Sequence, residues 1–339
     1  MIKKFFPILK TKSNSEPNAI KECLGFLGDY IIPYVEVIPE KEGSVKKRKS
    51  GFDKIRSLLK DKSFIAQCNR SDKQYMGTVD FGRYLEDTFS LTKSLNSNVC
   101  ISIFIRGEQE TFNYKKVNEY IELLHELGYQ VAVRCDCFND NVARITDSLE
   151  LDDYFIFDIG FSDISASFFV LMDIEERVRN PHFLVFSQEI NHNLGNKNYS
   201  ERGYNDGITN TSLMNYYVKQ GNDIFGIGGS CGTKNDTNEF FRGTMSYALF
   251  LTYDSSKNSF YSMRSEKSGE GSTAYRELVS KIESHFKYYE YGILKNCPIS
   301  TELLKKQFET HKPGNASTYI KITIINYLEQ INNLLSGNN

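Results

Sequence analysis

Charged side chains follow several short apolar runs of this sequence, at the points where predicted β-strands end. Residues 5–9 form one such run, which Lys10 and Lys12 follow, and residues 31–38 form another, which contains Glu36. Three more charged residues occupy similar positions in later runs: Asp80, Arg134 and Asp158. Lys and Arg can hold anionic oxygen atoms, whereas Asp and Glu can activate water or a sugar hydroxyl, or ligate a divalent cation. The set has the residue types of a ligand-binding or catalytic cleft.

The spacing of these residues indicates that they face one direction. Side chains two residues apart in a β-strand lie on the same side, so Lys10 shares a face with Ile8, and Asp158 shares one with Ile156. In a parallel barrel the C-terminal strand ends form the mouth, where active sites lie, and the charged ends would converge there. Buried charges must also be paired, so a salt-bridge network that only closes the top of the barrel is the alternative. The sequence leaves both interpretations open.

Three other features give weaker chemical signals. The glycine run 226–232 follows the predicted eighth strand, where barrels commonly bind phosphate, so Gly228 is a candidate anion-binding position and a plain turn is the alternative. His192 lies in a predicted loop, where it could act in acid–base chemistry. The basic stretch 41–50 is expected to be a solvated loop, with phosphate contact as the alternative.

The elements that must position these residues alternate between short apolar runs and charged stretches of helical spacing. Alternation of this kind is typical of parallel strands joined by helices. It predicts a TIM-like (β/α)8 barrel, regular or irregular, in the α/β class. The clearest helices are 114–127 and 166–178, and in the second we expect Phe169, Leu171 and Met172 to be buried. The eight predicted strands are 5–9, 31–38, 74–81, 99–105, 130–135, 154–159, 182–187 and 223–227.

The pattern changes after Gly228. Two β-like runs, 245–253 and 259–264, flank a polar connection suited to a hairpin, and Arg264 ends the second run. Helices are predicted at 273–289 and 316–335. The sequence therefore predicts a barrel over 1–228 and a hairpin with helices over 229–339, packed together as one structural unit.

Composition limits the classes of function. The 339 residues carry 41 Lys and Arg against 43 Asp and Glu, a formal net charge of −2, which disfavours nucleic-acid binding outside a local patch. No run approaches the ~18 apolar residues of a spanning helix, so no membrane role is expected. Seven Cys without regular spacing indicate reduced thiols and a cytoplasmic protein.

A set of short segments is spread over most of the chain. The segments are Pro7-Ile-Leu-Lys-Thr-Lys12, Ile32-Pro-Tyr-Val-Glu36, Val133-Arg134, Phe157-Asp-Ile-Gly160, Met263-Arg264 with Ala274-Tyr275-Arg276, and Gly314-Asn-Ala-Ser-Thr-Tyr319. In this order they resemble the blocks of the beta-protein family, which is named after a tailed-phage protein and found in bacteria, phages and mobile elements. The resemblance implies phage exclusion or antiphage defence, and it implies no particular reaction.

The chain departs from that family at two places. Family members tend to have Phe-Gly-Asp-Tyr-Gly after the eighth strand, whereas this chain has Phe225-Gly-Ile-Gly-Gly229 and lacks the carboxylate. A His pair often follows the Gly-Asn block, and Asn326-Tyr327 occupies that neighbourhood here. If those residues take part in chemistry, this chain has altered or lost it.

The leading hypothesis is an antiphage or phage-exclusion protein whose barrel mouth binds a phosphorylated small molecule or nucleotide, with hydrolysis as an extension. Its ligand-binding residues would be Lys10, Lys12, Arg134, Arg264 and Gly228. Its catalytic or cation-binding residues would be Glu36, Asp80 and Asp158.

Two alternatives remain open. The first is a non-catalytic sensor or adaptor that binds a phage protein or an effector through 229–339, with aromatic side chains at Phe240, Phe241, Tyr288, Tyr289 and Tyr291. The second is a nuclease that uses two-metal chemistry, which the near-neutral charge disfavours.

Overall fold

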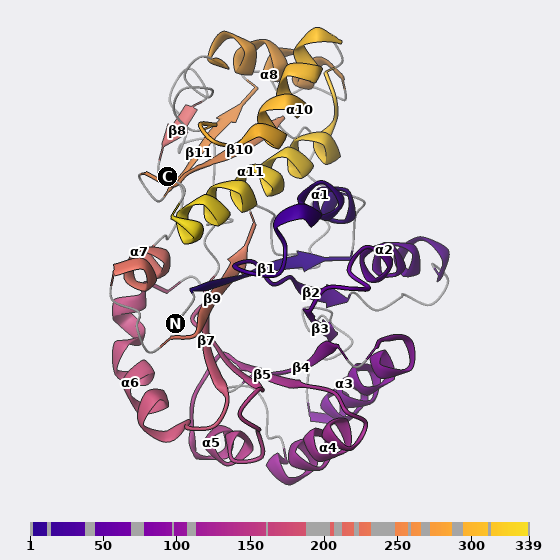
Figure 1. Cartoon of the computed structure of the whole chain (residues 1–339), viewed down its shortest axis with the longest axis vertical. Coiled ribbons are helices and arrows are strands. Elements are labelled where there is room, and N and C mark those ends of the chain that lie inside the picture. Colours follow the sequence, from indigo (N-terminus) through magenta and orange to yellow (C-terminus); the bar gives the residue numbers. More distant parts are fainter. Residues whose placement is uncertain are drawn as a thin grey trace.

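Eight parallel strands close into a barrel in the computed structural model, which confirms the predicted TIM-like fold (Figure 1). The strands pair in the order β1-β2-β3-β4-β5-β6-β7-β9. Their bounds are β1 (Lys4–Lys10), β2 (Tyr34–Val37), β3 (Phe64–Cys68), β4 (Val99–Ile105), β5 (Val131–Cys135), β6 (Tyr154–Asp158), β7 (His182–Ser187) and β9 (Gly226–Ser230). The structure describes residues 3–11, 15–37, 45–68, 78–96, 98–106, 113–160, 162–187, 204–206, 212–219, 224–231, 248–256, 259–265, 272–286, 294–310 and 313–337.

The predicted third strand is wrong. The third strand is Phe64–Cys68, and the end of the predicted run 74–81 instead begins helix α3 (Thr78–Ser90). Phe81, Tyr84 and Leu85 are buried at helical spacing, and the Tyr84 hydroxyl accepts a hydrogen bond from the backbone amide of Phe104, in the Val99–Ile105 strand, at 2.8 Å. The β-branched residues at 78–79 suggested a strand, but packing of the following turns decides the structure. Asp80 therefore lies on a helix and not at a strand end.

Helices surround the barrel, as Figure 1 shows. The helices differ from the prediction in two ways. Residues 45–50 were expected to form a loop, but they begin α2. Phe169 and Met172 of α6 were expected in the core, but they are exposed, at 85% and 52%. The run Phe168–Met172 is apolar on all sides, so periodicity could not tell which of its faces meets the barrel. The remaining bounds are α1 (Ser15–Cys23), α2 (Val45–Leu58), α4 (Tyr114–Glu126), α5 (Asp140–Thr146), α6 (Phe168–Arg177), α7 (Ser212–Lys219) and α11 (Ala316–Ser336).

The last helix, α11, serves both parts of the molecule. It packs on α1 and β1, where the rings of Phe5 and Tyr327 are 5.5 Å apart, and it lies beside the barrel near α1 in Figure 1. On its other side it packs on a second sheet. Although it lies beyond the boundary drawn at Gly228, it contributes to the barrel core.

The second sheet contains the predicted hairpin. It is antiparallel, in the order β10 (Leu249–Asp254), β11 (Ser259–Arg264) and β8 (Tyr204–Asp206). Helices α8 (Ser272–Ser284) and α10 (Pro298–Glu309) join α11 in covering it. Helix α11 also satisfies the outer edge of β10, because Thr323 donates to the Leu251 carbonyl and Asn326 accepts from the Tyr253 amide, both at 2.9 Å.

The barrel interior is filled by side chains. Phe6, Ile8, Tyr34, Leu184 and Phe186 are among the buried residues that pack there, as in other barrels of this type.

The glycine run belongs to strand β9, which corrects the expectation of an anion-binding loop. A Cβ at Gly228 would lie 2.2 Å from the Phe186 ring, and one at Gly226 would lie 2.6 Å from the Phe6 ring. Only glycine leaves room for these rings. Gly228 is also paired with both neighbouring strands, β1 and β7. Three glycines in the five residues 226–230 look like a loop in the sequence, whereas the structure uses two of them to make room for Phe rings beside a strand.

No helix among the residues described above is both long and apolar enough to cross a bilayer.

Candidate functional site

Four of the predicted charged residues lie at or one residue before the ends of their strands, on the mouth side of the barrel. Lys10 ends β1 and is in register with Glu36 of β2, while Arg134 and Asp158 lie on the neighbouring strands β5 and β6. All four are buried, with exposures from 3% for Arg134 to 7% for Glu36. The structure thus brings together two cations and two carboxylates from four different strands, at the end where barrels of this type carry their active sites.

Arg134 lies between the two carboxylates. Its Nη1 donates to Glu36 Oε1 at 2.9 Å, while its Nε and Nη2 donate to Asp158 Oδ2 at 3.0 and 2.5 Å. Three of the five guanidinium N–H groups are therefore used on carboxylates. The two carboxylates come from strands far apart in the sequence, and Arg134 fixes their separation.

Three aromatic rings surround the same guanidinium. Its central carbon, Cζ, lies 4.6 Å from the centre of the Phe104 ring, 5.4 Å from that of Tyr34 and 5.5 Å from that of Phe186. Such contacts are attractive for a cation that has lost its water. Burial by itself would lower the pKa of Arg134, but the charge of Asp158 and then the phenol of Tyr34 and the carboxylate of Glu36 hold it well above its usual value. Arg134 is a permanent cation in this position.

A second polar layer lies directly below. The Tyr34 hydroxyl donates to Gln67 Oε1 and lies 2.8 Å from the Ser102 hydroxyl. Burial raises the pKa of the Tyr34 phenol, so this hydroxyl keeps its proton and remains a donor. The polar groups of this layer hydrogen-bond to one another, so they form a fixed network beneath the charged layer.

Asp158 is held from both sides. Its Oδ2 takes the two bonds from Arg134, and its Oδ1 accepts a bond from the backbone amide of Gly160 at 2.9 Å. Gly160 has a φ of 59°, in the left-handed region that glycine adopts without strain. The turn after β6 therefore orients the carboxylate, and an Oδ1 with one bound hydrogen retains acceptor capacity.

The remaining predicted site residues are placed elsewhere or not described. Asp80 lies in the first turn of α3 and not on a barrel strand. Gly228 lies within β9, and Arg264 ends β11 on the second sheet, where its carbonyl accepts a bond from Lys281 at 3.1 Å. Outside the described residues lie Lys12 and His192 and the aromatic positions Phe240, Phe241, Tyr288, Tyr289 and Tyr291.

Strand β4 supplies site residues that the sequence reasoning missed. Ser102 and Phe104 face the barrel axis, and Arg106 follows at the same spacing of two, just past the strand end. The Arg106 guanidinium carbon lies 5.7 Å from the centre of the Phe104 ring. The signal was present, since Arg106 directly follows a correctly predicted strand. Gln67 could not be found in the same way, because the strand that carries it was not predicted.

The arrangement does not resemble a cation cage. Within the described part of the chain, no group of three or more His, Cys, Asp or Glu is placed to hold a metal ion. The guanidinium of Arg134 itself binds both Glu36 and Asp158. A divalent cation would have to compete with that guanidinium. What the arrangement can do is accept hydrogen bonds on oriented carboxylates and bind anions on nearby cations.

A separate ionisable cluster lies at the opposite end of the barrel. Asp153, just before β6, accepts bonds from the amides of Val131 and Glu150 at 2.7 and 2.8 Å and lies 2.8 Å from His125 Nε2. Burial raises the pKa of Asp153, and the amide bonds and His125 oppose that shift. This cluster ties the end of α4 to strands β5 and β6, which is a structural role.

No protein-family model matches this sequence, and a search of curated proteins found no match either.

Proposed function

We propose that the barrel mouth binds a phosphorylated small molecule or nucleotide, and that the protein acts in antiphage defence or phage exclusion. One observation carries the binding proposal: Lys10, Glu36, Arg134 and Asp158 are buried together at the C-terminal ends of four barrel strands. Burying such groups costs stability that apolar residues of similar volume would not cost. In a barrel, charged groups at this end are most readily explained by binding or catalysis.

The ligand would meet two kinds of group at the mouth. The carboxylates of Glu36 and Asp158, oriented by Arg134, would accept hydrogen bonds from ligand hydroxyl groups. Cations at the mouth, including Lys10, would face the anionic part of the ligand. If the ligand is hydrolysed, Asp158 is the residue that would take a proton from the attacking water, because its Oδ1 retains acceptor capacity.

The biological setting rests on the resemblance to the beta-protein family. Ile32-Pro-Tyr-Val-Glu36 and Phe157-Asp-Ile-Gly160 are among the segments that carry it, and they contain two mouth residues. If the setting is right, cells that express the protein should plate at least one tailed phage less efficiently than cells with an empty vector.

Ligand binding can be tested with native mass spectrometry of the purified full-length chain, followed by calorimetry with ATP and pyrophosphate. Asp158→Asn and Lys10→Ala should weaken binding, whereas the exposed neighbours Asp61→Asn and Lys60→Ala serve as matched controls. Should both mouth variants fold normally and keep full ligand binding and full phage exclusion, the mouth is not the functional site.

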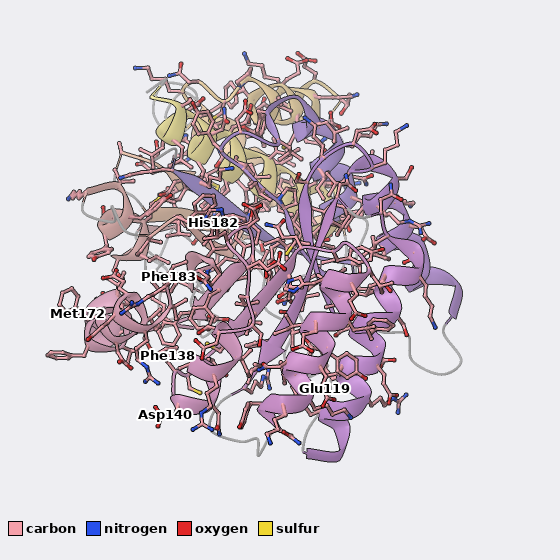
Figure 2. All side chains as sticks on the ribbon, turned by 60° about the horizontal axis from the view of Figure 1, so that its bottom comes forward. Glu119, Phe138, Asp140, Met172, His182 and Phe183 are labelled. Carbon is pink, nitrogen blue, oxygen red and sulfur yellow. The ribbon has the colours of Figure 1, made fainter. Side chains whose placement is uncertain are left out.

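A sensor or adaptor that binds a protein is the second candidate, and helix α6 favours it. Phe169 is 85% exposed, and its neighbours Phe168 and Met172 are exposed as well, with Met172 on the outer side of the molecule in Figure 2. A cluster of exposed large apolar side chains is a common mark of a protein-binding surface. The exposed apolar side chains that support this alternative thus lie on the barrel, whereas the sequence interpretation placed them in 229–339.

The two candidates predict opposite results for one variant. Phe169→Ser combined with Met172→Ser should abolish phage exclusion by an adaptor and leave ATP and pyrophosphate binding unchanged. For a cleft protein the same variant should keep both properties. Unfolding temperatures of the variant and the wild type should agree closely, because both side chains are exposed.

A further inference from the structure

We infer that Arg106 binds the anionic group of the barrel-mouth ligand, and that Arg134 is a positioning residue that the ligand does not contact; this rests on the function proposed above.

The first step is that the hydrogen-bond donors of Arg134 are already engaged. Its guanidinium already binds Glu36 and Asp158 and packs against three aromatic rings, and the residue is only 3% exposed. A phosphate would have to displace a carboxylate to form a bidentate contact with it. The charge of Arg134 is already paired with the two carboxylates, so Arg134 affects ligand binding only by orienting them.

The second step is the position of Arg106. It follows β4 two residues after Phe104, and Phe104 is in register with Arg134. The guanidinium carbons of Arg106 and Arg134 lie 5.7 and 4.6 Å from the centre of the same Phe104 ring. Arg106 is thus at the rim of the mouth, and it is half-buried where Arg134 is fully buried.

The third step compares the ion pairs that the two arginines make. No ion pair in the described part of the chain involves Arg106, whereas Arg134 is paired with two carboxylates. The Arg106 guanidinium lies over the Phe104 ring with its carbon 5.7 Å from the ring centre, and this cation–π contact favours one position of the side chain before a ligand binds. An oriented guanidinium with its donors uncommitted is suited to the bidentate recognition of phosphate.

These groups together indicate the class of ligand. A phosphate on Arg106 would leave the rest of the molecule facing Asp158 and Glu36, which can accept hydrogen bonds from hydroxyl groups. The ligand class is therefore a phosphate ester of a hydroxylated compound, such as a nucleotide, and not inorganic phosphate alone.

The test compares Arg106→Gln with a matched control in the full-length protein. Arg144→Gln is the control, because Arg144 also lies over an aromatic ring, 5.3 Å from the centre of Tyr114, but on α5 and away from the mouth. Calorimetry would measure affinity for ATP, for pyrophosphate and for adenosine, which lacks phosphate, at low and high salt. Circular dichroism melting would check that each variant folds.

The inference predicts that Arg106→Gln weakens ATP binding by about tenfold or more, as expected for a lost charge-assisted contact, and leaves adenosine binding unchanged. The loss should be smaller at high salt, and Arg144→Gln should bind as the wild type does. If the wild type binds ATP and Arg106→Gln binds it equally well, the assignment to Arg106 is overturned while the proposed function stands. If the wild type binds neither ATP nor pyrophosphate, the proposed function fails and this inference fails with it.

Discussion

The substitution Gly228→Ala tests whether the glycine run of β9 exists to make room for barrel aromatics. The added Cβ would lie 2.2 Å from the Phe186 ring, against 3.4–4 Å for an ordinary contact, so the ring would have to move by about 1 Å. That ring is fully buried and packs against Tyr34 with 5.0 Å between ring centres, which leaves it little freedom to move. Overpacking of this kind costs up to about 3 kcal/mol in a tight core. For a chain of this size that corresponds to a fall in Tm of about 4 °C.

Urea unfolding followed by far-ultraviolet circular dichroism measures this change, since the chain contains no Trp to serve as a fluorescent probe. Gly25→Ala is the control, because a Cβ there meets no atom within 4 Å, and it should change stability by less than about 1 kcal/mol. A double-mutant cycle with Phe186→Ala isolates the contact. Once the ring is absent, Gly228→Ala should cost about 1 kcal/mol or less, so the coupling should reach about 2 kcal/mol.

Two results would refute the reasoning. Gly228→Ala could prove as stable as Gly25→Ala, which would mean that β9 has space at this position. Alternatively, the cost of Gly228→Ala could remain the same when Phe186 is truncated, and then the clash would involve another group.

Three further predictions concern the charged layer, the opposite end of the barrel and the second sheet. Arg134→Met should destabilise the protein by about 3–5 kcal/mol in urea unfolding near pH 8, because it leaves Glu36 and Asp158 buried without their cation. The pKa of Asp153 is raised in the folded state, so this residue stabilises the fold most at low pH. That contribution is lost as pH rises from the pKa of the unfolded chain, near 4, through the pKa of the folded protein. Asp153→Asn should therefore be most destabilising at the acid end of a pH series of urea unfolding curves. Asn326→Leu, which leaves the buried Tyr253 amide unsatisfied, should cost about 1–3 kcal/mol in the same assay, and Asn333→Leu on the same helix should cost less.

The fold was largely predictable because most strands are short, buried apolar runs. Residues 99–105 and 182–187 are predicted to their exact bounds, because Asn98 and Arg106 flank the first run and Pro181 and Gln188 flank the second. The third strand was missed because Phe64–Cys68 is short and contains a buried Gln67, which makes it look polar. In the structure the Gln67 side chain accepts a hydrogen bond from Tyr34, which explains why a polar residue is buried in this strand. Tyr34 lies far away in the sequence, so residues 64–68 alone could not indicate this partner.

The site could be predicted only as far as strand ends and alternation determine it. Glu36, Arg134 and Asp158 face the barrel axis near the C-terminal ends of their strands, and that follows from the period of two, although only β5 and β6 are adjacent and β2 lies three strands from β5. Which cation would bind the two carboxylates could not be predicted, because it depends on how far each side chain reaches across the barrel. Asp80 shows the opposite limit, since the strand predicted to carry it is a helix, and the period of two does not apply to it.

The glycine run links core packing to the mouth, which gives the perturbation of β9 a second consequence. Phe186 owes its position to the missing Cβ of Gly228, and its ring centre lies 5.5 Å from the Arg134 guanidinium carbon and 5.0 Å from the Tyr34 ring centre. A ring displaced by about 1 Å would press on the guanidinium that orients Asp158. Gly228→Ala should therefore weaken ATP binding in conditions where the variant remains folded, through the displaced Phe186 ring. If the variant loses stability and keeps full affinity, Arg134 is held by its carboxylates alone and the aromatic packing around it does not set the geometry of the mouth.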